Sequence, residues 1–275
     1  TVMINLSLNW WDYIALFSII FIGIPHGALD GAIAITLGYT KNLTQKLYFI
    51  IIYLVVSLVV IILWYLFPVI TLILFLLTSI FHFGCGDLGW KKDKLYFVCG
   101  YVHGGLVVLG IIFLNKVEVS YFFEILSGNQ LSMLWVCLHI AIFLWFISIV
   151  YISLNYDKIR VSSYYIKLLM LISIIIILLP PLPAFAIYFC LIHSVHHVKR
   201  IVPILLNFME KQKVIFLMII FSLFSWFGCG IGFYFLSNLN TYPDTIIKVT
   251  FIGLAALTFP HMILVDGIFR SKFEI

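Results

Sequence analysis

Long apolar runs separated by short polar stretches dominate this chain. A helix needs about 20 apolar residues to cross the hydrocarbon core of a bilayer. That length predicts nine helical segments, at residues 10–37, 47–67, 69–86, 95–114, 131–154, 164–180, 184–198, 214–237 and 248–270. Pro68 and the prolines at 180, 181 and 183 divide two pairs of segments, because proline removes a helical hydrogen bond and clashes with the preceding turn. The seventh segment is short, so a merged or re-entrant form is an alternative, and eight spans is the second interpretation.

The positive charges test this count. With nine alternating spans, 14 of the 16 Lys and Arg residues fall on one side, and only Lys116 and Lys248 fall on the other. Cytoplasmic loops carry an excess of Lys and Arg. The asymmetry predicts an N-terminus outside and a C-terminus in the cytoplasm of a multi-pass protein of the cell (inner) membrane.

Composition agrees with a membrane protein. The chain has 275 residues, of which 64% are hydrophobic and 10% charged, with a net charge of +5; its mean hydropathy is +1.19. Soluble domains average about 45–50% apolar and about 25% charged residues. The basic residues lie at segment ends, which argues against a nucleic-acid partner, and five scattered cysteines indicate no disulfide framework. We predict an all-α polytopic bundle of about 8–9 transmembrane helices, forming one domain over residues 1–275.

Four of the histidines within these apolar segments are the main candidates for a site: His26, His82, His193 and His197. An unpaired polar group in hydrocarbon costs several kcal/mol, so ionisable residues in a span indicate a functional site. All four are predicted in the cytoplasmic half of the membrane, where one site can gather them. Histidine is the commonest metal ligand, and four neutral imidazoles can hold one divalent ion. The sequence therefore predicts an intramembrane metal site, with no catalytic residue beyond it.

Spacing adds to this prediction. His193 and His197 are four positions apart in the sequence, which places both imidazoles on one helix face. His26 and Asp30 have the same spacing, so the carboxylate is a candidate to orient that imidazole. Asp87 follows His82 by five residues, which makes a direct pairing of those two doubtful. Further candidates for the surroundings of the site are His103, His196, His261 and Asp266; His139, toward the outer side, is interpreted as structural.

Two other functions fit parts of this pattern. HSVHH (193–197) has the form of an HxxHH box, as in membrane di-iron desaturases and hydroxylases. Those enzymes need several paired boxes, whereas the other histidines here occur singly. A metal or proton transporter would use the histidines and Asp30 as a relay, but it needs acidic residues through both leaflets. The outer halves of the segments are nearly devoid of them.

Several motifs resemble the Brp/Blh family of bacterial and archaeal β-carotene 15,15′-dioxygenases. They are PHGALD (25–30), HFGCGD (82–87), HGG (103–105), FCLIHSVHH (189–197) and VTFIGLAALTFPHMILVD (249–266). The resemblance implies a membrane oxygenase that cleaves the central double bond of β-carotene with O2 into two molecules of all-trans-retinal. It also implies an Fe(II) cofactor held by His26, His82, His193 and His197. Retinal would pass to a microbial rhodopsin, and the lipid-dissolved substrate would enter between helices from the bilayer.

Overall fold

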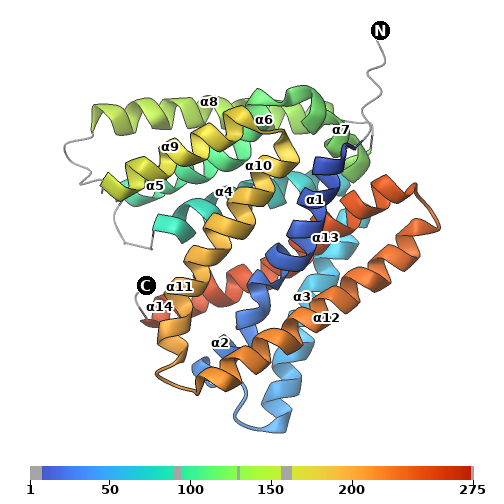
Figure 1. The fold of residues 1–275 in the computed structure, drawn as a ribbon, viewed down its shortest axis with the longest axis vertical. Coiled ribbons are helices and arrows are strands. Elements are labelled where there is room, and N and C mark those ends of the chain that lie inside the picture. Colours follow the sequence, from blue (N-terminus) through green and yellow to red (C-terminus); the bar gives the residue numbers. More distant parts are fainter. Residues whose placement is uncertain (1–7, 89–93, 129–130, 156–162, 274–275) are drawn as a thin grey trace.

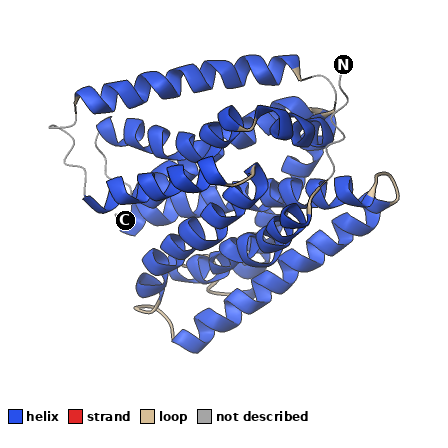
Figure 2. Ribbon diagram, turned by 45° about the horizontal axis from the view of Figure 1, so that its top comes forward, coloured by secondary structure: helices blue, strands red, loops and turns tan. Residues whose placement is uncertain are grey.

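The computed structural model describes residues 8–88, 94–128, 131–155 and 163–273. Within these ranges every regular element is a helix, and short turns and loops join the helices (Figure 2). In chain order the elements are α1 (Trp10–Ser18), η1 (Ile19–Gly23), η2 (Ile24–Leu29), α2 (Asp30–Leu37), α3 (Leu43–Leu66), α4 (Pro68–Leu88), α5 (Lys94–Gly105), η3 (Leu106–Gly110), α6 (Ile111–Leu114), α7 (Lys116–Ser127), α8 (Ser132–Leu154), α9 (Ser163–Leu178), α10 (Pro181–Ile187), η4 (Tyr188–His193), α11 (Ser194–Leu205), α12 (Lys211–Ser237), α13 (Tyr242–Met262), η5 (Ile263–Phe269) and α14 (Arg270–Phe273). The element η2 is a 3₁₀-helix, and the other η elements are π-helical.

Eight runs of helix in the described residues are long and apolar enough to cross a membrane. Seven of them correspond to predicted segments within a few residues. The eighth, Pro181–Leu205, has 25 residues and is longer than the predicted 184–198. This segment is therefore long enough to cross a membrane by itself. The predicted segment 164–180 forms α9, whose 16 residues are fewer than a perpendicular span requires.

Proline sets two of the helix boundaries, as the sequence predicts. Helix α3 ends at Leu66 and α4 begins at Pro68. Helix α9 ends at Leu178 and α10 begins at Pro181, where the missing N–H is one that the first helical turn leaves unbonded in any case. Pro260 behaves differently, because α13 continues through it to Met262 before the backbone becomes π-helical.

Helices α4 and α5 pack closely through glycine. A Cβ added at Gly84 would collide with the backbone of Gly100, and one at Gly104 would collide with the backbone of Ile80. Small residues let helix backbones approach one another, which is how helices associate in lipid. On the other side of α5, the Trp145 indole of α8 lies against Gly105. These glycines set the position of α4, the helix that carries His82.

The helices pack into one bundle, in which α4 contacts both α3 and α5, and α13 contacts both α7 and α12 (Figure 1). Helices α5, α8 and α9 lie toward one end of the molecule, and α3, α12 and α13 lie toward the other, with α10–η4–α11 running between them. A hydrophobic cluster of buried side chains joins α2, α11 and η5, and includes Ile33, Ile201 and Phe269. Because these elements adjoin His26, His193 and His261 in the chain, their packing brings distant histidine-bearing segments together.

Candidate metal centre

Four buried histidines from three separate parts of the chain form one cluster. His82 lies on α4, His193 ends η4, His197 lies on α11, and His261 lies near the end of α13. Ring centres are 5.0 Å apart for His82 and His193, 5.5 Å for His82 and His261, and 5.0 Å for His197 and His261. None of the four is more than 5% exposed. The fold therefore gathers four imidazoles away from solvent.

The spacing of the rings suits a shared ion. Two imidazoles that bind one ion through nitrogen at about 2.0–2.1 Å hold their ring centres about 5 Å apart. Among the described residues, however, no three His, Cys, Asp or Glu side chains already stand where a bound ion would require them. The fit therefore rests on the kind and spacing of the donors, and not on a preformed cage.

Three of the four imidazoles share the same support: Nδ1 faces a carboxylate oxygen at hydrogen-bond distance. The pairs are His82 with Asp266 at 2.7 Å, His193 with Asp87 at 2.9 Å, and His261 with Asp30 at 2.8 Å. A carboxylate can only accept, so Nδ1 carries the proton and Nε2 carries the lone pair. Metal-binding histidines in proteins almost always donate their other ring N–H in this way. The supports thus prepare three rings to bind a cation through Nε2.

Asp87 is a shared acceptor. Besides His193, it lies 3.2 Å from Nε2 of His103, and the Tyr188 hydroxyl donates to it at 2.7 Å. Its side chain is only 2% exposed. The Arg200 guanidinium donates to the backbone oxygens of Gly86 and Asp87, next to the end of α4. The orientation of His193 therefore depends on residues from α4, α5, η4 and α11.

Asp30 supports His261 from a different side. Its second oxygen accepts a hydrogen bond from the Tyr53 hydroxyl of α3 at 2.9 Å. A Cβ added at Gly27 would lie 3.5 Å from Asp30, 3.7 Å from the Tyr53 hydroxyl and 3.9 Å from Nδ1 of His261. The backbone next to His26 therefore adjoins this network. The His26 side chain itself lies outside what the structure describes.

The predicted residues of the site can now be placed. Of the four predicted ligands, the structure gathers His82, His193 and His197, and it adds His261, which was predicted as a candidate for the surroundings of the site. Asp30 was predicted to orient His26, but the described contact is with His261. Asp87 contacts His193 and His103, while the partner of His82 is Asp266 from the opposite end of the chain. His196 is only partly buried, and His139 is exposed on α8.

Sequence reasoning missed the residues that hold the carboxylates. Tyr53 and Tyr188 lie in apolar runs where nothing distinguishes them from lipid-facing tyrosines. Arg270 was counted among the cytoplasmic charges, yet it is 6% exposed and lies 3.2 Å from Asp266. A basic residue four positions after an intramembrane aspartate was the available signal, because that spacing places both on one helix face.

Comparison of the sequence with known proteins identifies the family to which the chain belongs. Residues 17–269 match the family described as Beta-carotene 15,15′-dioxygenase. The chain belongs to this family. One relative, the Beta-carotene 15,15′-dioxygenase of Uncultured marine bacterium 66A03, is 37% identical over 262 residues, which cover 94% of each chain. No solved structure matches.

The motifs on which the sequence resemblance rests supply the residues of the cluster. HFGCGD provides His82 and Asp87, FCLIHSVHH provides His193 and His197, and the C-terminal motif provides His261 and Asp266. In HGG, His103 contacts Asp87, while the two glycines adjoin Ile80 and Trp145. The motifs that carry the resemblance thus come together in space around one group of imidazoles.

Proposed function

We propose that this chain cleaves the central 15,15′ double bond of β-carotene with O2. One O2 is consumed, and each of the two central carbons receives one oxygen atom as an aldehyde, which gives two molecules of all-trans-retinal. The match to the dioxygenase family over almost the whole chain carries this proposal. The cluster of imidazoles supported by carboxylates is consistent with it.

The cofactor in this proposal is one ferrous ion. His82, His193 and His197 would hold it together with His26, the fourth ligand that the sequence predicts. His261 is the alternative fourth ligand, because its ring lies 5.0 Å from that of His197. When bound, ferrous iron supplies the one-electron chemistry that lets O2 react with a polyene.

The chain's own residues orient and enclose the site. Asp266, Asp87 and Asp30 hold the protons on Nδ1 of three rings and balance part of the charge of the ion. Buried aromatic rings, including Phe83 and Phe189 beside His193, exclude water from the surroundings of the cluster. Exclusion of water protects the reacting polyene from side reactions.

We further propose that the cluster lies in the cytoplasmic half of the cell (inner) membrane. The charge asymmetry of the sequence supports an external N-terminus and a cytoplasmic C-terminus. β-Carotene would enter from the lipid, and retinal would leave into it for a microbial rhodopsin.

The test is to purify the protein without oxygen, measure iron per chain, and then supply β-carotene and O2. We expect one iron per chain and two retinal molecules per O2 consumed. His193→Ala and His197→Ala should each lose iron and retinal formation. His139→Ala is the matched control, because this exposed histidine lies on α8 away from the cluster.

Other outcomes would contradict specific parts of the proposal. Two irons per chain would indicate a di-iron oxygenase, and metal transport without oxygen consumption would indicate a transporter. Full iron content in both α11 variants would exclude these histidines as ligands. Comparing the iron content of His26→Ala with that of His261→Ala identifies the fourth ligand without relying on activity.

A further inference from the structure

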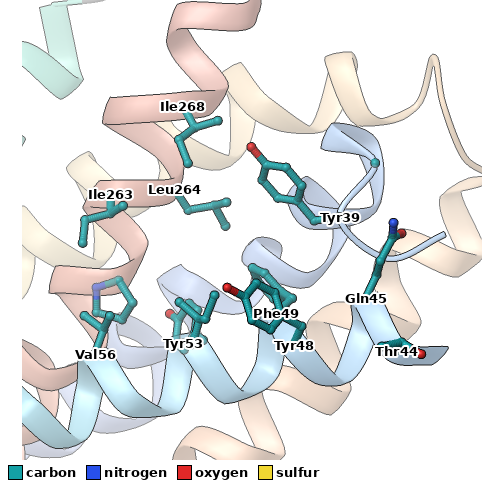
Figure 3. A pocket seen from close by; sticks show the side chains of 13 residues that line it. Tyr39, Thr44, Gln45, Tyr48, Phe49, Tyr53, Val56, Ile263, Leu264 and Ile268 are labelled. Carbon is teal, nitrogen blue, oxygen red and sulfur yellow. The ribbon is translucent and has the colours of Figure 1, made fainter. Parts of the chain in front are cut away.

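A cavity of about 450 Å³ lies between α3 and the α13–η5 segment (Figure 3). Its lining residues carry no charged side chain, and most are aromatic or aliphatic. Pockets for small molecules in proteins typically measure about 300–1,000 Å³ and are lined mainly by apolar groups. The cavity is therefore large enough for a sizeable neutral ligand and chemically unsuited to an ionic one.

One wall of this cavity adjoins the histidine cluster. Tyr53 lines the cavity and donates its hydroxyl to Asp30, which in turn accepts from Nδ1 of His261. Pro260, the residue directly before His261, also lines it. The cavity wall and the imidazole are thus connected by two consecutive hydrogen bonds and by the chain itself.

The cavity is elongated along α3. Its lining on this helix extends from Thr44 to Val56, which corresponds to about 18 Å at the helical rise per residue. Tyr48 and Ile52, which line it, are 67% and 44% exposed. Because α3 is an apolar span with little of its surface buried, these exposed side chains face the region that lipid would occupy. A ligand dissolved in the bilayer could enter here without crossing water.

We infer that this cavity binds one end ring and the adjoining half-chain of the carotenoid, and so sets which double bond lies at the cluster. The inference rests on the proposed function. A long neutral polyene matches the apolar lining and the elongated shape, and the Tyr53 wall is joined through Asp30 to His261 of the cluster. Residues of the lining are then specificity-determining residues, although they do not touch the reacting atoms.

The test fills the cavity from both walls. Ile52→Trp on α3 and Ile268→Trp on η5 place a large ring in the space, whereas Ile51→Trp adds the same ring at a neighbouring exposed position outside the lining. Binding of β-carotene to iron-free protein is measured by quenching of protein fluorescence, and KM for retinal formation is measured with iron present. We expect both cavity variants to weaken binding and raise KM about ten-fold or more, because a filled pocket excludes its ligand. The iron content of both cavity variants should equal that of the unmodified protein. The control variant Ile51→Trp should bind β-carotene and show a KM like the unmodified protein.

The measurements separate this inference from the proposed function. Unchanged β-carotene binding and KM in correctly folded, iron-loaded Ile52→Trp and Ile268→Trp would overturn the inference. If the unmodified protein forms no retinal, the proposed function fails. Weakened binding in the cavity variants would still identify the cavity as a carotenoid site in that case. Should one tryptophan variant fail to fold, the other decides the question from the opposite wall.

Discussion

Asp266→Asn should damage the protein in two separable ways. One oxygen of Asp266 accepts from His82 at 2.7 Å, and the other faces the Arg270 guanidinium at 3.2 Å. Asparagine has the same shape but only one acceptor oxygen, and its other end is an NH2 donor. If the oxygen faces His82, the NH2 group meets a guanidinium. If the amide is reversed, the NH2 group faces the N–H of the His82 imidazole, and two donors meet.

The structure gives the size of each effect. At 3.2 Å and an effective dielectric constant of about 20, the attraction between the two charges is about 5 kcal/mol. Removing one partner of a buried ion pair typically costs about 3–5 kcal/mol. The Asp266 side chain is 12% exposed, so we expect the lower end, about 3 kcal/mol. Loss of a carboxylate that supports a metal-binding histidine typically weakens metal affinity about 10–100-fold. Asp266→Asn removes the support of His82, so we expect the iron affinity of this variant to fall by that factor.

Thermal unfolding in detergent and titration with ferrous iron measure the two effects separately. In Asp266→Asn/Arg270→Met the guanidinium is absent, so at least half of the lost stability should return while iron affinity stays low. Asp244→Asn makes the same chemical change in the first turn of α13, away from the cluster. It should leave iron affinity unchanged and lower stability by less than about 1 kcal/mol, because it removes only a favourable charge at a helix N-terminus. Iron affinity and unfolding temperature equal to those of the unmodified protein would refute the assignment of Asp266 to both contacts.

Two further predictions concern the packing that positions α4. Gly104→Ala should destabilise the folded protein by about 1–3 kcal/mol in thermal unfolding, because the added Cβ collides with the backbone of Ile80. Gly230→Ala is the control: the space around Gly230 is open, so this change should be neutral or slightly stabilising. Equal stability of the two variants would contradict this packing. Trp145→Phe removes the 3.0 Å hydrogen bond to the Val102 carbonyl and should cost about 1 kcal/mol in the same assay, and an unaltered melting temperature would show that this bond contributes nothing.

Most of the fold could be predicted from the sequence, because a bilayer imposes one length on every apolar helix. Proline marked the boundaries at Pro68 and Pro181 correctly. The predictions failed where tertiary contacts decide. No helix was predicted between the segments 95–114 and 131–154, yet helix α7 lies there. It buries Val119 and Phe122, and its Leu126 carbonyl accepts a hydrogen bond from Trp64 at 2.9 Å. Such a short amphipathic helix has no hydropathy signal of its own.

The candidate site was predictable in its residue types and only partly in its pairings. Rules based on spacing within one helix found the shared face of His193 and His197. They cannot find partners that lie far apart in the chain, such as His82 with Asp266 or His261 with Asp30. Those pairs depend on how helices pack, and one sequence carries no record of that packing except the restriction to small residues where helices touch.

The π-helical turns make the site sensitive to the number of residues in each helix. Each such turn holds one residue more than an α-helical turn, and η4 contains His193 while η5 contains Asp266. Deleting one residue from η4 would give a more regular helix. It would also rotate Tyr188 by about 100° relative to His197, because each residue advances an α-helix by that angle. Single-residue deletions in these turns should therefore be less well tolerated than in the regular part of α12, and homologous helices are expected to keep their residue count even where side chains differ.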